Sequence, residues 1–169
     1  MVTSTKTNTY RATHKTRQPL PQDVRDQVIP VLSHLLADTS DLYFQVKEAH
    51  WNVKGPDFIG LHKLFDDVAA DITEYIDQIA ERIAQLGGQV FGTLQHAAHA
   101  SRLPGYPESI NSGSDHVSAV SKALAQYSDH TRQGIDHSDE FGDPVTADLL
   151  TGITANIDKW LWFIESHNL

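Results

Sequence analysis

The strongest constraint on the fold is a long helical pattern between residues 57 and 86. Apolar residues recur here at spacings of three, four or seven, as on one buried face of an α-helix. They are Phe58, Leu61, Phe65, Val68, Ile72, Ile76, Ile79, Ile83 and Leu86. Asp57 fits as the N-cap, and Gly87-Gly88 fits as the stop. The pattern therefore predicts one helix with a single stripe facing a core.

A second, polar stripe lies on the same predicted helix. With His62 set at zero, Asp66, Asp77 and Glu81 fall at about 40°, 60° and 100° around the axis. His62 and Asp66 are one turn apart, as are Asp77 and Glu81, so each pair can hold a metal ion between neighbouring side chains. The alternative is a solvated charged face, which such pairs commonly form.

One chain cannot bring these two pairs of side chains together. Eleven residues separate Asp66 from Asp77, which is roughly 16 Å of helical rise, whereas metal–ligand bonds are only about 2.0–2.2 Å long. Two copies of the helix, packed antiparallel about a two-fold axis, would place His62 and Asp66 of one chain opposite Asp77 and Glu81 of the other. The spacing therefore predicts a metal site shared between subunits.

The rest of the chain carries three further long helical patterns and one short one. The long patterns cover residues 23–51, 112–138 and 144–166. Pro30 is expected to kink the first helix or to set its start, and Asp143 fits as the N-cap before Pro144. Residues 89–111 form a long crossover, with a short helix between Thr93 and Ser101. We expect an all-α four-helix bundle with one long connection.

Composition limits the class of protein. A length of 169 residues suits one domain, which we place at residues 23–169. No apolar run approaches 18 residues and no apolar N-terminal segment resembles a signal peptide, so we expect no membrane contact and a cytoplasmic location. The absence of cysteine excludes disulfides and thiolate ligands.

The charge is distributed unevenly between the first 22 residues and the rest. The first 22 hold no acid and four basic residues, namely Lys6, Arg11, Lys15 and Arg17, whereas the remainder carries a formal charge of −13. This segment is rich in threonine and lacks apolar periodicity, so we expect a disordered basic tail. It could contact DNA phosphates, and the alternative is a solubilising tail.

Several motifs along the chain resemble those of the Dps family, the "DNA-binding proteins from starved cells" or mini-ferritins. The resemblance covers roughly residues 23–167. Its central part consists of AHWNVKG at 49–55, Phe58-Ile59, Leu61-His62, Asp66, Asp77, Ala80-Glu81-Arg82 and Leu86-Gly87-Gly88. It continues at Gly92-Thr93, Tyr106-Pro107, Thr146-Ala147-Asp148, Asp158-Lys159 and LWFIE at 161–165.

The resemblance implies a ferritin-like bundle that assembles into a dodecameric cage. It implies a ferroxidase that oxidises Fe(II), preferably with hydrogen peroxide, stores ferric mineral and protects DNA. By position match, His50, His62 and Asp66 of one subunit would bind iron with Asp77 and Glu81 of its mate. Trp51, beside this centre, would intercept oxidising intermediates. Zn(II) should compete for the site, because it binds nitrogen and oxygen ligands more tightly than Fe(II).

Two further groups of residues have open assignments. Asp139, Asp143 and Asp148 resemble positions that line negatively charged three-fold pores in the family. The alternative makes Asp143 only a helix cap and Asp148 only a first-turn acid. His96 and His99 are three residues apart and could bind a metal, although no acid partner is near them in the sequence.

Two other functions remain compatible with the sequence. One is a DNA-compacting, nucleoid-associated protein that binds through the basic tail, with the metal site secondary. The other is a purely structural four-helix oligomer, in which the acid stripe is a solvated face.

Overall fold

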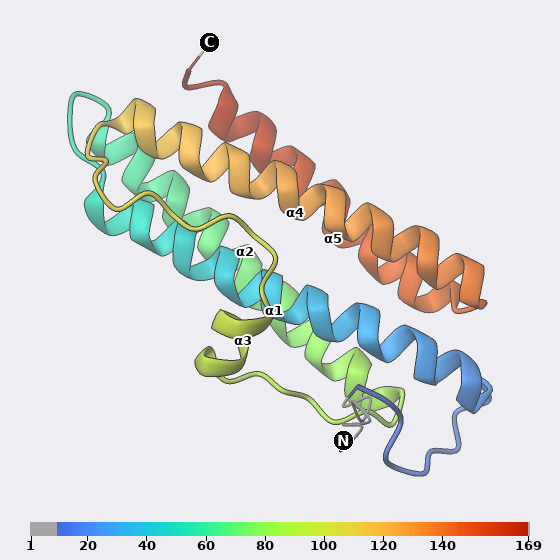
Figure 1. The fold of residues 1–169 in the computed structure, drawn as a ribbon. Helices are drawn as coiled ribbons and strands as arrows, with labels where there is room; N and C mark the ends of the chain where they lie inside the picture. Colours follow the sequence, from blue (N-terminus) through green and yellow to red (C-terminus); the bar gives the residue numbers. More distant parts are fainter. Residues whose placement is uncertain (1–9, 169) are drawn as a thin grey trace, which may run out of the picture.

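The predicted helices are all present in the computed structural model, which describes residues 10–168. Within these residues the helices are α1 (Gln22–Asn52), α2 (Phe58–Gln85), α3 (Leu94–Ala100), α4 (Gly113–Phe141) and α5 (Pro144–Glu165). α1 and α2 form one antiparallel pair, and α4 and α5 form the other (Figure 1). α1 packs on α4, and α2 touches α5, so the two pairs enclose a common core. The expected all-α four-helix bundle is confirmed.

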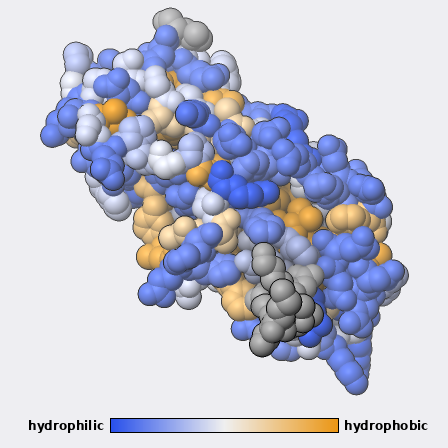
Figure 2. Space-filling model, in the orientation of Figure 1, coloured by the Kyte–Doolittle hydropathy of each residue, from blue (hydrophilic) through white to orange (hydrophobic). Residues whose placement is uncertain are grey.

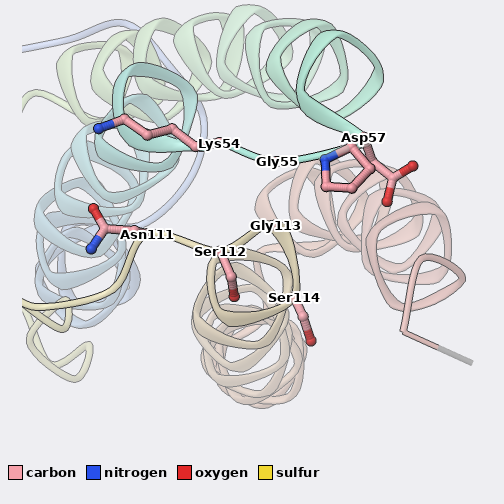
Figure 3. A pocket seen from close by; sticks show the side chains of 8 residues that line it. Lys54, Gly55, Asp57, Asn111, Ser112, Gly113 and Ser114 are labelled. Atoms are coloured by element: carbon pink, nitrogen blue, oxygen red, sulfur yellow. The ribbon is translucent and has the colours of Figure 1, made fainter.

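The segment between α2 and α4 is the long crossover, and it carries α3. α3 packs against α1, and the chain then runs along the bundle to the start of α4 (Figure 1). Near that point Lys54, in the turn after α1, donates its backbone N–H to the carbonyl of Asn111 at 3.2 Å. A hollow of about 510 Å³ lies between this turn and the start of α4 (Figure 3). The crossover thus reaches the end of the bundle where α1 turns into α2.

Most of the apolar stripe of α2 is buried as the sequence predicts, but Phe58 at its start is 42% exposed and Ile76 is only partly buried. Phe65, Val68, Ile72, Ile79 and Ile83 are all fully enclosed in the core, whereas the outer face drawn in Figure 2 is mainly hydrophilic with scattered hydrophobic patches. No helix among residues 10–168 is long and apolar enough to cross a membrane.

Two details of the helix boundaries differ from expectation. α1 begins at Gln22 and continues through Pro30, so the proline does not set its start. The buried neighbours Ile29 and Leu32 hold this turn in the core, so packing offsets the one backbone bond that proline removes. Asp57 occupies the N-cap position of α2, but its side chain makes no capping bond.

The expectation of a disordered tail reaching residue 22 is wrong for residues 10–14, which contact the bundle. The Tyr10 ring lies edge-on to His34, Phe91 and His96, and its hydroxyl is 2.8 Å from Nε2 of His96. The backbone N–H groups of residues 12–14 also have partners: Ala12 donates to Asp26 at 2.8 Å, and Thr13 and His14 both donate to the carbonyl of Gly87. An aromatic anchor and backbone hydrogen bonds therefore hold this part of the segment. Residues 1–9, with Lys6, lie outside the described residues.

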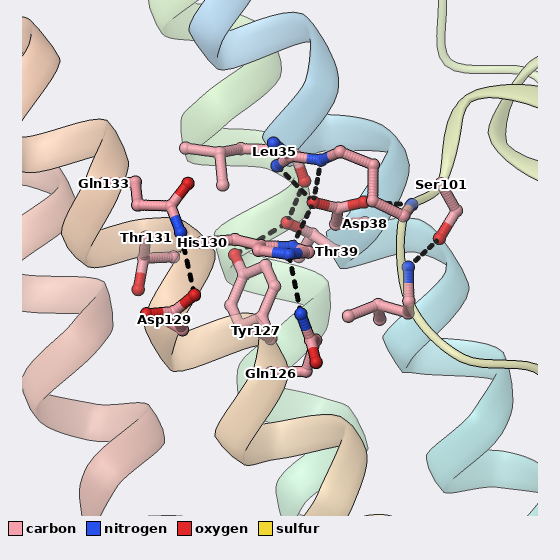
Figure 4. Close-up of polar contacts among 12 residues, drawn as sticks. Leu35, Asp38, Thr39, Ser101, Gln126, Tyr127, Asp129, His130, Thr131 and Gln133 are labelled. Carbon is pink, nitrogen blue, oxygen red and sulfur yellow. Dashed lines mark hydrogen bonds and ion pairs between the residues drawn. The ribbon is translucent and has the colours of Figure 1, made fainter.

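A buried carboxylate ties the crossover to the bundle. Asp38 on α1 is 0% exposed. It accepts hydrogen bonds from the backbone N–H of Arg102 at 2.7 Å, from the Arg102 guanidinium, and from Nδ1 of His130 at 3.0 Å. Nε2 of His130 is in turn 3.1 Å from the amide of Gln126 (Figure 4). A buried charge is tolerated only when it is paired and hydrogen-bonded, and Asp38 meets both conditions.

We predict that Asp38→Asn destabilises the fold by roughly 3 kcal/mol, because it leaves Arg102 and His130 around a neutral group in a buried network. The free energy of unfolding can be measured by urea denaturation at a fixed protein concentration. Asp129→Asn is the matched control, since Asp129 is exposed and its side chain accepts one hydrogen bond among the described residues, from Gln133. Equal stability of the two variants would contradict the assigned role of Asp38.

Candidate metal centre

The end of α1 and the start of α2 are joined by a reciprocal pair of hydrogen bonds between two histidines. Nδ1 of His50 lies 2.8 Å from the carbonyl oxygen of His62, and Nδ1 of His62 lies 2.8 Å from the carbonyl oxygen of His50. The two rings are stacked, with centroids 3.8 Å apart and an angle of 20° between their planes. The two backbones therefore fix both imidazoles in one orientation.

These bonds also determine the tautomer of each ring. A carbonyl oxygen only accepts, so both Nδ1 atoms must carry hydrogen. In the neutral imidazoles, Nε2 is then the atom with a free lone pair. This is the arrangement found around metal-binding histidines, in which the second ring nitrogen donates to a carbonyl or a carboxylate. The described chain thus presents two preoriented nitrogen ligands.

Asp66 lies one turn after His62 and forms an ion pair. Its Oδ1 atom is 2.7 Å from Nζ of Lys47 and 3.9 Å from Nδ1 of His50. The hydrogen bond from Lys47 is the main reason that the pKa of Asp66 is lowered from its usual value. The carboxylate therefore stays ionised to a lower pH than an isolated aspartate would, and a carboxylate must be ionised to bind a metal. No local sequence pattern indicates this contact, because Lys47 and Asp66 are 19 positions apart.

Asp77 and Glu81 lie on the same helix but far from the histidines. α2 is continuous from Phe58 to Gln85, so Asp66 and Asp77 are separated by about 16 Å along its axis. Both Asp77 and Glu81 are exposed. Within residues 10–168 of one chain, no three histidine, aspartate or glutamate side chains lie close enough together to hold a metal ion. The structure therefore brings the His50 and His62 rings together, with Oδ1 of Asp66 3.9 Å from Nδ1 of His50, but these three side chains do not form a metal-holding group by themselves. Asp77 and Glu81 lie apart from them.

Exposed apolar side chains surround the histidine pair. Trp51, next to His50, is 60% exposed, and Ile59 is 59% exposed. Phe58 is also exposed, and its ring centroid is 5.2 Å from that of His62. Nζ of Lys47 lies over the Trp51 ring, 5.7 Å from its centroid. An apolar rim around polar ligands is typical of a surface that another molecule covers.

Asp143 does not have the role in a pore that the sequence suggested. Its side chain is only 1% exposed, and it forms a bidentate ion pair with Arg82 at 2.8 and 2.9 Å. It also accepts from the backbone N–H of Thr146, as an N-cap. The pore interpretation is therefore wrong for Asp143, because both carboxylate oxygens are enclosed and paired. Asp139 and Asp148 are exposed, and Asp148 lies beyond the first turn of α5.

Two other features do not form metal sites. His96 bonds to Tyr10, and Nδ1 of His99 donates to the carbonyl of Gln95 at 2.6 Å, so the two histidines have separate partners. The hollow in Figure 3 is lined by residues 54–57 and 111–114, which include no histidine and only one acid, Asp57.

Comparison with known proteins identifies the class. The family model for the Ferritin-like domain matches residues 29–168. The chain is 42% identical over 155 residues to the "DNA protection during starvation protein" of Agrobacterium fabrum, covering 92% of this chain and 96% of that protein. Among solved structures, DpsC from Streptomyces coelicolor has a TM-score of 0.88 at 29% identity, covering 97% of this chain and 96% of that one.

Dps from Microbacterium arborescens, solved "in the high iron form", has a TM-score of 0.81 at 28% identity, covering 90% of this chain and 97% of that one. The family model, the Agrobacterium fabrum relative and both solved structures agree on a ferritin-like bundle of the Dps kind. The chain belongs to the Dps family.

We predict that His50 and His62 both carry hydrogen on Nδ1 in the metal-free protein. Magic-angle-spinning ¹⁵N NMR distinguishes the two tautomers by the nitrogen shifts and their couplings to the ring carbons. His167, exposed near the end of the chain, should show a mixture of tautomers. A dominant Nε2–H form at His50 or His62 would contradict the reciprocal carbonyl bonds.

Proposed function

We propose that this protein is a ferroxidase of the Dps type. It oxidises Fe(II) at centres shared between two subunits, and it stores the ferric product inside a cage. The observation that carries the proposal is the preoriented histidine pair, together with a second acidic pair too distant to join it within one chain. The match to the Ferritin-like domain supports iron as the substrate.

In the proposed centre, each chain contributes a different half. His50, His62 and Asp66 of one subunit face Asp77 and Glu81 of its mate. A two-fold contact is self-complementary, so each dimer forms two equivalent centres. The exposure of Trp51, Phe58 and Ile59 in the single chain supports such a contact, because the contact would bury these apolar side chains.

The residues divide the chemistry between them. The neutral imidazoles supply nitrogen ligands through Nε2, and the three carboxylates offset the charge that increases as Fe(II) becomes Fe(III). Two Fe(II) ions give two electrons to one hydrogen peroxide, which takes up two protons and forms two water molecules, so no hydroxyl radical is released. Trp51 is placed to intercept oxidising species that escape.

Lys47 sets a condition for iron binding. Its ammonium group lies 2.7 Å from Oδ1 of Asp66. An Fe(II) ion that binds Asp66 must therefore displace this ammonium group. An exposed ion pair of this kind contributes only about 0–1 kcal/mol, which a metal ion bound by several ligands easily offsets. Lys47 therefore keeps Asp66 ionised and ordered without blocking the site.

The cage and its location complete the proposal. A dodecamer would enclose the mineral, and Asp139 and Asp148 would attract Fe(II) towards its pores. The Agrobacterium fabrum relative is named for DNA protection during starvation, and removal of Fe(II) and peroxide in the cytoplasm would serve that end.

A second function is supported by the exposed basic residues near the N-terminus. Arg11, Lys15 and Arg17 are exposed and could contact DNA, as in a DNA-compacting protein whose metal site is secondary. A purely structural oligomer gains no support, since such a protein would need no histidine pair with both Nε2 atoms available.

We predict that two inactive variants restore each other when they are assembled together. The first variant carries His50→Ala and His62→Ala, and the second carries Asp77→Ala and Glu81→Ala. In a mixed dimer, one centre has lost both halves and the other is intact. Random mixing should therefore return about a quarter of the wild-type centres, because half of the dimers are mixed. Anaerobic Fe(II) loading followed by hydrogen peroxide measures the oxidation rate.

Each variant assembled alone is the control and should oxidise little iron. Gel filtration with iron counted in the protein peak shows whether the product is stored in a cage-sized species. Mass spectrometry shows whether mixed dimers have formed. If they have formed and the mixture is as inactive as each variant alone, the proposal of a shared centre is wrong.

We also predict that Zn(II) inhibits iron oxidation when about two ions are added per centre, because Zn(II) binds nitrogen and oxygen ligands more tightly than Fe(II). The oxidation rate is measured against the zinc added, and Mg(II), which prefers all-oxygen sites, is the control. Inhibition by both ions alike would indicate a general charge effect.

A further inference from the structure

A polar hollow lies under the docked N-terminal segment, away from the metal centre. We define the strap as residues 10–17. Its residues 12–16 form one wall of the hollow, and Gln22 and Arg25 at the start of α1 form the other; the volume is about 270 Å³. The residues that line it include the basic Lys15 and Arg25, His14 and two threonines, but no acidic residue.

Arg25 is the central observation. Its side chain is only 9% exposed. Nε donates to the carbonyl of Leu20 at 3.2 Å, and Nη1 donates to that of Leu86 at 2.9 Å. Among residues 10–168, no acid lies within ion-pair distance of Arg25, and its Nη2 makes no hydrogen bond. A buried charge is costly unless an opposite charge accompanies it, so this guanidinium lacks an anion.

The start of α1 adds donors to the same place. Pro21 is at the N-cap position and provides no side-chain capping bond, so the first N–H groups of this 31-residue helix keep their partial positive charge. Two acids are near: Asp23 is exposed in the first turn, and Asp26 is bound to the backbone of Ala12. Neither of them lines the hollow.

We propose that this hollow is a binding site for a phosphate group, held by Arg25, Lys15 and the N-terminus of α1. A guanidinium, an ammonium and free helix N–H groups are the donors that bind phosphate in proteins. The phosphate comes from inorganic phosphate or from a DNA backbone, since both present the same oxygens. The site is independent of the ferroxidase centre.

Gly87 lies at the point where the strap passes close to Arg25. Its φ is +82°, and a Cβ atom at this position would lie 2.7 Å from the carbonyl oxygen of His14 and 3.1 Å from Nη1 of Arg25. Only glycine lets the strap cross so close to the guanidinium. Gly87→Ala should therefore displace the strap and open the hollow.

The test titrates the full-length, metal-free protein with sodium phosphate and measures the heat of binding, with sodium chloride at matched ionic strength as the reference. Lys15→Gln and Arg17→Gln are the matched pair. Both remove one exposed charge from the strap, but only Lys15 lines the hollow. We expect Lys15→Gln to weaken phosphate binding about five-fold, and Arg17→Gln to change it by less than about two-fold.

Two further variants give independent readouts. Arg25→Gln should weaken phosphate binding more than Lys15→Gln does, and Gly87→Ala should weaken it while speeding tryptic cleavage after Lys15. Circular dichroism shows whether each variant is folded. If Arg25→Gln unfolds, the comparison of Lys15→Gln with Arg17→Gln still tests the proposed phosphate site. Equal heats for phosphate and chloride, or equal effects of Lys15→Gln and Arg17→Gln, would overturn the proposal.

A short DNA duplex separates the two sources of phosphate. If the duplex displaces inorganic phosphate from the wild-type protein, and Lys15→Gln weakens duplex binding more than Arg17→Gln, the site takes the DNA backbone. If inorganic phosphate stays bound in excess duplex, the site takes free phosphate. Both results keep the site and assign its ligand.

Discussion

A straight helix cannot bend back on itself, and this constraint governs both the chemistry and the assembly of the protein. α2 carries His62 and Asp66 near its start and Asp77 and Glu81 about 16 Å further along its axis. Under the proposed function, the ligands can meet only when a second chain supplies the missing half. Iron oxidation and subunit pairing would then depend on the same surface, so a lone subunit would not release oxidised iron into its surroundings.

Polar contacts join segments that are distant in the sequence, two of them near helix ends and one, at Asp38, in the middle of α1. The reciprocal bonds between His50 and His62 join α1 to α2, and the Arg82–Asp143 pair joins the end of α2 to the start of α5. Asp38 joins the crossover to α1 and α4. The apolar stripes alone would allow the helices to slide along one another. These directional contacts favour one register, and that register positions the ligand side chains.

Helical periodicity is sufficient to predict the four long helices and the crossover, because these depend on neighbours within about one turn. The two ligand pairs, inferred from the same one-turn spacing, stay a prediction. Periodicity could not predict contacts made through folded backbone. The carbonyl partners of His50 and His62 are main-chain atoms, which no side-chain pattern encodes. The resemblance suggests a pore role for Asp143, with a helix cap as the alternative, and no local pattern indicates its pairing with Arg82, 61 positions away. The lack of apolar periodicity predicts disorder up to residue 22, whereas a single aromatic, Tyr10, anchors the described part of that segment.

The docked strap changes how the basic residues near the N-terminus can act. A free tail samples many positions, and its charges contribute a weak, diffuse attraction that salt screens. Tyr10 and the backbone bonds to Gly87 instead hold Lys15 at the edge of a hollow that also contains Arg25. The entropy of ordering the segment is then lost on folding rather than on binding. A fixed pair of cations can therefore recognise one phosphate group by geometry, which a mobile tail of the same charge cannot do.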